Sequence, residues 1–141
     1  MVTLLDVNVL IALADAEHKH HQIVANWFVS QRARPWASCP ITENGFIRIL
    51  AQSSYTHFAD DIEIIRKILN QIKSSPGHQF WPDSISICDQ KRIPNLQNSK
   101  ATTDLYLLAL AVKNKGQLVT LDSKIKFDNV NGGKNAYLLL Q

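Results

Sequence analysis

The stretch from Val2 to Leu13 reads VTLLDVNVLIAL and places an acidic residue between two apolar runs. Its first four residues form a short, mostly apolar run without alternation, which favours a strand buried on both faces, as in a parallel sheet. Asp6 follows directly, and the Ala- and Leu-rich run over residues 7–14 predicts a helix. The sequence therefore places a carboxylate at the carboxyl end of a strand and at the start of a helix, where open α/β sheets bind their ligands.

The composition is that of an ordinary globular domain. With 141 residues, of which 45% are hydrophobic and 19% charged, the chain suits one domain with a full core. Its net charge of +3 is compatible with a polyanionic partner without requiring one. Cys39 and Cys88 are too few for a disulfide framework and lack the neighbours of a catalytic thiol. The absence of a signal-peptide pattern and of a membrane-length apolar run predicts a cytoplasmic protein that does not insert into membranes.

Strand and helix patterns alternate along the chain, which indicates an α/β sandwich with a mainly parallel sheet and one domain over residues 1–141. The expected strands are 2–5, 35–39, 79–81, 118–121 and 136–140, and the expected helices are 7–14, 20–32, 41–51, 60–73 and 102–115. Residues 84–88 alternate in polarity and could form either a strand or a short helical turn.

Four acidic residues share one predicted position, the carboxyl edge of the sheet. Asp6 and Asp122 each follow a short apolar strand, whereas Asp104 and Glu43 lie near the starts of helices that begin at that edge. Carboxylates that converge on one crevice repel one another and raise their own pKa values. A divalent cation such as Mg²⁺ or Mn²⁺, which prefers oxygen ligands, removes the conflict and can activate water against a phosphodiester.

Four short motifs carry these acids: LDVNVL at 5–10, ITENGF at 41–46, TDLYLLALA at 103–111 and VTLD at 119–122. In this order and spacing the chain resembles the PIN-domain ribonucleases of the VapC toxin type over nearly its whole length. The resemblance implies a PIN-like three-layer α/β/α sandwich with four to five strands in a mainly parallel central sheet. It also implies the toxin of a toxin–antitoxin system, an endoribonuclease that depends on Mg²⁺ or Mn²⁺.

The resemblance assigns roles by motif position. Its catalytic acids correspond to Asp6, Glu43, Asp104 and Asp122. Asp6 and Asp104 are expected as the primary metal ligands, and Asp122 and Glu43 as completing the set directly or through water. Asn8 and Thr120 match polar positions that support the acids. The implied reaction is in-line attack of metal-activated water, which leaves a 5′-phosphate and a 3′-hydroxyl.

The expected partners are an RNA substrate, a small antitoxin with a segment that enters the active-site groove, and a second copy of the chain. Arg48 is a candidate contact for a substrate phosphate or for acidic residues of the antitoxin, and Lys124 and Lys126 are candidate phosphate contacts. Each could equally be a solvated side chain.

Other interpretations remain open from the residues alone. Each acid taken singly could be a helix cap or a turn residue. A phosphohydrolase with Asp6 as nucleophile would need a second Asp where Asn8 stands, and a non-catalytic PIN domain that binds RNA or protein would not need every acid. The histidines from His18 to His21 could bind zinc, but solvated loop histidines fit the spacing better.

Overall fold

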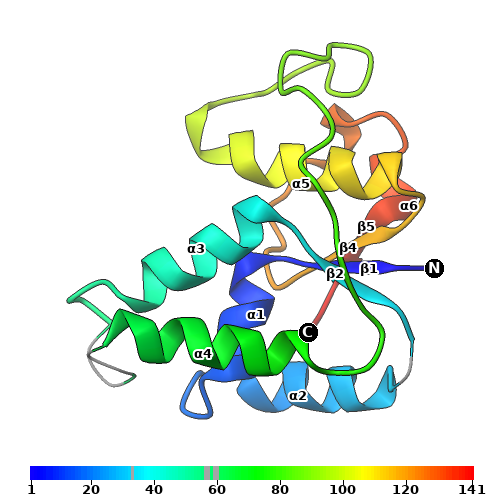
Figure 1. Ribbon diagram of the computed structural model, residues 1–141. Coiled ribbons are helices and arrows are strands. Elements are labelled where there is room, and N and C mark those ends of the chain that lie inside the picture. Colours follow the sequence, from blue (N-terminus) through cyan, green and yellow to red (C-terminus); the bar gives the residue numbers. More distant parts are fainter. Residues whose placement is uncertain (33, 56–57, 59–60) are drawn as a thin grey trace.

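A five-stranded sheet forms the centre of the computed structural model, which describes residues 1–32, 34–55, 58 and 61–141 (Figure 1). All of its strand pairs are parallel, and the strand order is β3-β2-β1-β4-β5. The strands are β1 (Thr3–Leu5), β2 (Trp36–Ser38), β3 (His78–Phe80), β4 (Gln117–Thr120) and β5 (Tyr137–Leu139). The helices are α1 (Val7–Ala14), α2 (His21–Ser30), α3 (Pro40–Leu50), α4 (Ile62–Lys73), α5 (Thr102–Lys113) and α6 (Gly133–Ala136), with short 3₁₀ turns at Ser99–Ala101 and Phe127–Asn129.

Helices cover both faces of the sheet, as Figure 1 shows, with α1 to α4 on one side and α5 and α6 on the other. Successive side chains of β1 point to opposite faces of the sheet, and both faces are apolar. Leu4 packs in the cluster with α5, and Leu5 packs in the cluster with α1 and α3. Both side chains are completely buried. The predicted three-layer α/β/α sandwich is therefore confirmed, with five parallel strands.

The central position of β1 brings the far parts of the chain together. β1 pairs with β2 on one side and with β4 on the other, and the Asp6 amide continues this ladder by donating to the Val119 carbonyl at 3.0 Å. The carboxyl ends of β1 and β4 consequently lie side by side, with Asp6 beyond one strand and Asp122 beyond the other.

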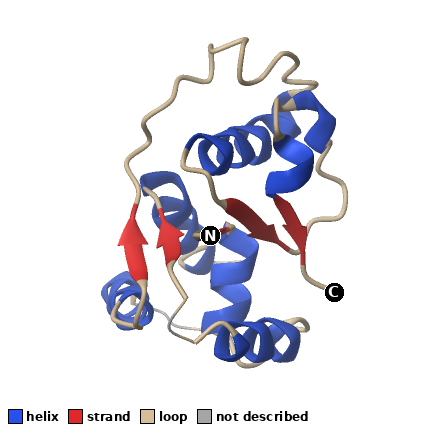
Figure 2. Ribbon diagram, turned by 90° about the vertical axis from the view of Figure 1, so that its right-hand side faces the viewer, coloured by secondary structure: helices blue, strands red, loops and turns tan. Residues whose placement is uncertain are grey.

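Several boundaries differ from the prediction. Residues 84–88 form neither a strand nor a helix, and they belong to a long connection over 81–98 that leads from β3 to α5 (Figure 2). The helix expected over 60–73 begins at Ile62, because the Asp61 side chain caps it by accepting from the Glu63 amide at 2.8 Å; Asp60 lies outside the described residues. Residues 131–135, for which the turn-rich sequence predicts a loop, contain the start of α6 (Gly133–Ala136).

In the part of the chain that the structure describes, no helix combines the length and the apolar character that crossing a membrane requires.

Candidate active site

Asp6 is held in place by the two elements that it joins. Its side chain is only 5% exposed. One carboxylate oxygen accepts from the Val7 amide at 2.7 Å, and the other accepts from the Thr120 hydroxyl at 2.7 Å. Burial raises the pKa of Asp6 above its ordinary value, and these two hydrogen bonds oppose the rise. The sequence therefore builds a buried carboxylate with a fixed orientation.

The Thr120 hydroxyl connects the ends of β1 and β4. It is completely buried, donates to Asp6, and accepts from the Asn8 amide group at 3.3 Å and from the Asp122 backbone N–H at 3.1 Å. Asn8 in turn accepts from the Leu121 amide at 3.2 Å. The two residues predicted to support the acids thus join the first turn of α1 to the end of β4.

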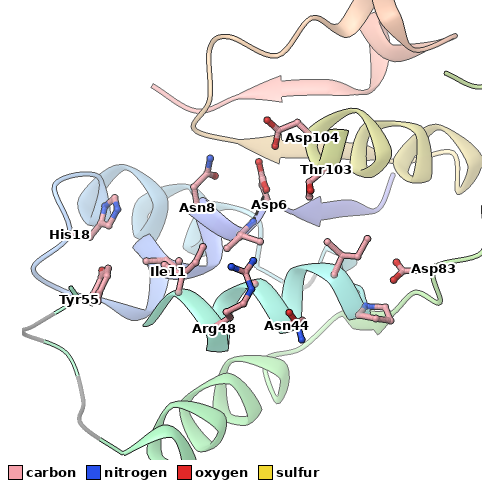
Figure 3. A pocket seen from close by; sticks show the side chains of 15 residues that line it. Asp6, Asn8, Ile11, His18, Asn44, Arg48, Tyr55, Asp83, Thr103 and Asp104 are labelled. Atoms are coloured by element: carbon pink, nitrogen blue, oxygen red, sulfur yellow. Dashed lines mark hydrogen bonds between the residues drawn. The ribbon is translucent and has the colours of Figure 1, made fainter. Parts of the chain in front are cut away.

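Asp104 approaches Asp6 from the first turn of α5, and Figure 3 shows the two side chains pointing toward one another. Partial burial, together with the charges of Asp6 and Asp122, raises the pKa of Asp104 to about 7. Asp122 also raises the pKa of Asp6. One oxygen of Asp122 accepts from the Lys124 amide at 2.8 Å, which closes a turn after β4. Three of the four predicted acids therefore interact electrostatically at the carboxyl edge of β1 and β4.

Glu43 is the predicted acid that the structure does not bring to this cluster. Its carboxylate accepts from the Ser38 hydroxyl at 2.6 Å and pairs with the Lys73 ammonium at 3.0 Å. The cause is the phase of α3, since successive residues of a helix are rotated by about 100° and Asn44 instead faces the pocket beside Asp6. The catalytic role of Glu43 stays a prediction.

A pocket with a volume of about 670 Å³ opens in front of Asp6 and Asp104. Its walls come from α1, α3, the start of α5 and three loops, and it is lined by Asp6, Val7, Asn8, Ile11, His18, Pro40, Ile41, Asn44, Gly45, Arg48, Ile49, Tyr55, Asp83, Thr103 and Asp104. Gly45 permits the close contact of α3 with α1, because a Cβ atom there would lie 2.8 Å from a methyl carbon of Val7. That contact turns the next helical position on the same face, Arg48, toward the pocket (Figure 3).

The predicted basic contacts lie on both sides of the acids. Arg48 lines the pocket described above, and no carboxylate among the described residues forms an ion pair with it. Lys124 and Lys126 line a second hollow that also contains Asp104 and Asp122. Asp104 belongs to both hollows, so positive charge approaches the acids from two directions.

The donor set at this site suits a hydrated divalent ion. Within the described residues, no group of three or more His, Cys, Asp or Glu side chains forms a ready-made metal site. Asp6 and Asp104 nevertheless present carboxylates to one pocket, and burial together with the charges of neighbouring acids raises their pKa values. Mg²⁺ commonly binds through one or two carboxylates and keeps several waters, so the residues present fit such an ion.

Sequence reasoning missed several residues of the pocket. Asn44 could have been found from Arg48, because residues four apart lie on the same helix face. Tyr55 and Asp83 come from irregular loops, where no periodic pattern indicates the direction of a side chain. His18, considered only for zinc, also lines the pocket.

Comparison with known proteins shows which family the chain resembles. The model of the PIN domain family matches residues 3–132. Ribonuclease VapC44 of Mycobacterium tuberculosis is 41% identical over 140 residues, which cover 98% of each chain. Ribonuclease VapC38 of the same species is 36% identical over 124 residues, which cover 88% of this chain and 87% of the relative.

Two solved structures share the fold. The crystal structure of Mycobacterium tuberculosis VapC20, a toxin that cleaves the sarcin–ricin loop, superposes with a TM-score of 0.66 at 10% identity and covers 91% of this chain and 95% of that one. A chain of VapBC2 from Rickettsia felis, solved bound to a DNA fragment of its promoter, superposes with a TM-score of 0.61 at 14% identity and covers 100% and 98%.

Proposed function

The chain belongs to the PIN-domain family of VapC ribonucleases, and from this premise we propose that it cleaves RNA at the pocket between α1, α3 and α5. It is the ribonuclease toxin of a toxin–antitoxin system. This function takes the place of the phosphohydrolase alternative, in which Asp6 was the nucleophile.

One observation carries the assignment of the site. Asp6 and Asp104, which are 98 positions apart in the sequence, face the same pocket, and each is surrounded so that its negative charge is unfavourable. A fold does not retain such a conflict for stability, and perturbed carboxylates in a pocket are typical of functional sites. Asp122 adds a third negative charge from the end of β4.

We propose that Asp6, Asp104 and Asp122 hold Mg²⁺ or Mn²⁺ when the ion is bound. There the ion would supply Lewis-acid polarisation of a phosphodiester oxygen and a water of lowered pKa. The chain itself would orient this set through Thr120 and Asn8, which fix Asp6 against the end of β4. Glu43 would act from the neighbouring Ser38–Lys73 contact, not as a ligand.

Basic side chains would position the RNA backbone. We propose that Arg48 contacts a phosphate on one side of the scissile bond and that Lys124 and Lys126 contact phosphates on the other side. The location of these side chains in the two hollows that flank Asp104 supports the assignment. Phosphate contacts of this kind fix the register of a nucleic acid without reading its sequence.

We further propose the remaining partners and setting. A small antitoxin would insert a segment into the pocket, two copies of the chain would form a homodimer, and the protein would act as a single domain in the cytoplasm. The solved VapBC2 assembly is consistent with an antitoxin partner, because its toxin-like chain shares this fold.

The test uses purified protein and total RNA with Mg²⁺, and sequencing of the new RNA ends. We expect defined cleavage sites that vanish with EDTA, return with Mg²⁺ or Mn²⁺, and are absent for Asp104→Asn. The exposed Asp128 provides a control, since Asp128→Asn should cleave like the native protein. Equal cleavage by Asp104→Asn would overturn the assignment of the site.

A further inference from the structure

The pocket has two chemically different ends, which α1 separates. The acids lie at the amino end of α1, whereas His18 and Tyr55 lie beyond its carboxyl end, and both rings line the pocket with Ile11 between (Figure 3). α1 has eight residues, so it spans about 12 Å at the rise of an α-helix. The aromatic end is therefore about as far from the acids as a neighbouring nucleotide is from the reacting phosphate.

The loop after α1 fixes the His18 ring. Its Nδ1 accepts from the His20 amide at 3.0 Å, so the neutral ring carries its proton on Nε2. The His18 amide donates to the Asp15 carbonyl at 3.0 Å, and partial burial lowers the pKa of His18, which favours the neutral ring. Within the described residues no hydrogen bond uses the Nε2–H of this ring, so an uncharged, oriented ring can offer a donor to a flat, polar ligand.

The buried carboxylate of Asp15 also fixes the second ring. Asp15 is 3% exposed; one of its oxygens accepts from the Tyr55 hydroxyl at 2.5 Å, and the other accepts from the Glu17 amide at 3.0 Å. A single residue thus holds the Tyr55 side chain and the turn that carries His18. Ring contacts add to this positioning, because Tyr55 meets Phe58 edge-on with ring centroids 6.2 Å apart and His18 lies 5.7 Å from the His20 ring. Both His18 and Tyr55 nevertheless line the pocket.

The α3 wall contributes polar groups along the pocket, with Arg48 toward the aromatic end and Asn44 toward the acids (Figure 3). Asn44 and Arg48 are exposed and line the pocket. Among the described residues, the Asn44 amide makes no side-chain hydrogen bond and therefore offers both a donor and an acceptor. Aromatic side chains are the groups on which proteins stack unpaired RNA bases.

We propose that the His18–Tyr55 end of the pocket is a subsite for an unpaired nucleobase of the RNA, one or two nucleotides from the scissile phosphate. His18 and Tyr55 provide the stacking surfaces for this base. The subsite belongs to the pocket in which we propose RNA cleavage, so it rests on the proposed ribonuclease function. It makes cleavage depend on a base that takes no part in the reaction.

The geometry favours a base over a peptide segment as the ligand of this end. The rings lie in the same pocket as the carboxylates, so an RNA strand with a phosphate at the acids and at Arg48 continues directly onto them. Occupation by an antitoxin segment is the competing outcome, and the experiment separates the two.

The experiment uses an oligoribonucleotide built around a mapped cleavage site, with a single abasic ribose placed in turn at each position near the cut. For the native protein, we expect one position two or fewer nucleotides from the cut at which loss of the base lowers kcat/KM by about tenfold, the scale of one stacked base. His18→Ala should lower kcat/KM on the intact oligonucleotide by a similar factor. On the oligonucleotide that lacks this base, His18→Ala and the native protein should have the same kcat/KM.

Two variants complete the test. Gln22→Ala is the control, because the exposed Gln22 side chain bonds to Asn26 and does not line the pocket; it should behave like the native protein. His18→Phe keeps a flat ring and should recover most of the lost activity, which a general structural defect would not allow.

The outcomes are distinct. If cleavage requires Asp104 but no abasic position slows the native protein, or if His18→Ala loses equally on both oligonucleotides, the subsite is overturned while the ribonuclease function stands. It is also overturned if His18→Ala changes only inhibition by the antitoxin. If the native protein cleaves no RNA, or Asp104→Asn cleaves equally well, the proposed function itself fails.

Discussion

Asp104 and Glu43 lie near the starts of two helices at the same edge of the sheet, yet their surroundings differ in kind. Asp104 faces the charges of Asp6 and Asp122, and no cationic side chain of the described residues pairs with it. Glu43 is paired with Lys73 at 3.0 Å and accepts from Ser38. The first carboxylate requires a positive charge from outside the chain, whereas the second already has one from α4.

This difference separates two uses of a carboxylate. The Glu43–Lys73 pair, with Ser38 and with His78 at 2.8 Å from the Ser38 hydroxyl, joins α3, α4, β2 and β3. It holds the wall that carries Asn44 and Arg48. Asp6 and Asp104, by contrast, repel one another, so they do not hold α1 and α5 together. The first cluster is therefore structural in form, and the second is suited to bind a cation.

The largest expected effect is on the uncompensated side. Asp104→Asn should lower RNA cleavage by more than about a hundredfold, because the charge stabilisation that a bound ion provides is worth several kcal/mol. The measurement is the initial rate on a defined oligoribonucleotide at saturating Mg²⁺, with Asp128→Asn as control. A loss below tenfold would remove the contrast with Glu43.

Glu43→Gln should have a smaller effect, about tenfold or less in cleavage rate, because this carboxylate acts through the position of α3. Lys73→Met should cause a similar loss if Glu43 serves mainly as the partner of Lys73. The same oligoribonucleotide assay compares the variants. A hundredfold loss for Glu43→Gln with little loss for Lys73→Met would show that Glu43 leaves Lys73 and joins the acids when substrate or metal binds.

Gly45 lies between the two regions, at the contact of α3 with α1. Gly45→Ala should lower the free energy of unfolding by about 1 kcal/mol, because crowding against Val7 outweighs the better helix propensity of Ala. In a Val7→Ala background the same change should instead stabilise the protein by about 1 kcal/mol. Urea denaturation measures both, and destabilisation in both backgrounds would contradict the role assigned to this contact.

The smallest effect concerns stability without metal. The pKa of Asp104 is raised to about 7 in the folded protein, so the folded state holds this proton more tightly than the unfolded state, and stability falls as the pH rises from about 4 to about 7. Asp104→Asn should therefore be more stable than the native protein above pH 7, by about 1 kcal/mol, because partial exposure screens much of the shift. The difference should vanish near pH 4.

Thermal unfolding in EDTA at several pH values measures this difference, again against Asp128→Asn. A native protein that is more stable than Asp104→Asn at pH 8 in EDTA would show that Asp104 has a cationic partner within the folded chain.

The sequence was sufficient for the layers of the fold and for the positions of Asp6, Asp104 and Asp122. Parallel strands end at one edge, so a residue that follows a buried strand is placed by the strand itself. The direction of Glu43 was not predictable in the same way. A shift of one residue along a helix turns a side chain by about 100°, and the sequence does not fix the rotation of α3 about its axis.

Loops set the other limit. Tyr55 and the turn of His18 depend on Asp15, a contact between residues 40 apart that has no periodic signature. The alternation of residues 84–88 left a strand and a short helical turn open, and the structure forms neither within the connection over 81–98.

The strand order also has a consequence for protein synthesis. Thr120, whose hydroxyl orients Asp6, follows it by 114 positions, and Asp104 and Asp122 are similarly distant. A ribosome that has translated the first hundred codons has produced Asp6 but neither of the other two acids. Interrupted translation products that stop before β4 consequently lack the assembled centre, and nuclease activity can arise only after the chain has left the ribosomal tunnel far enough for β4 to pair with β1.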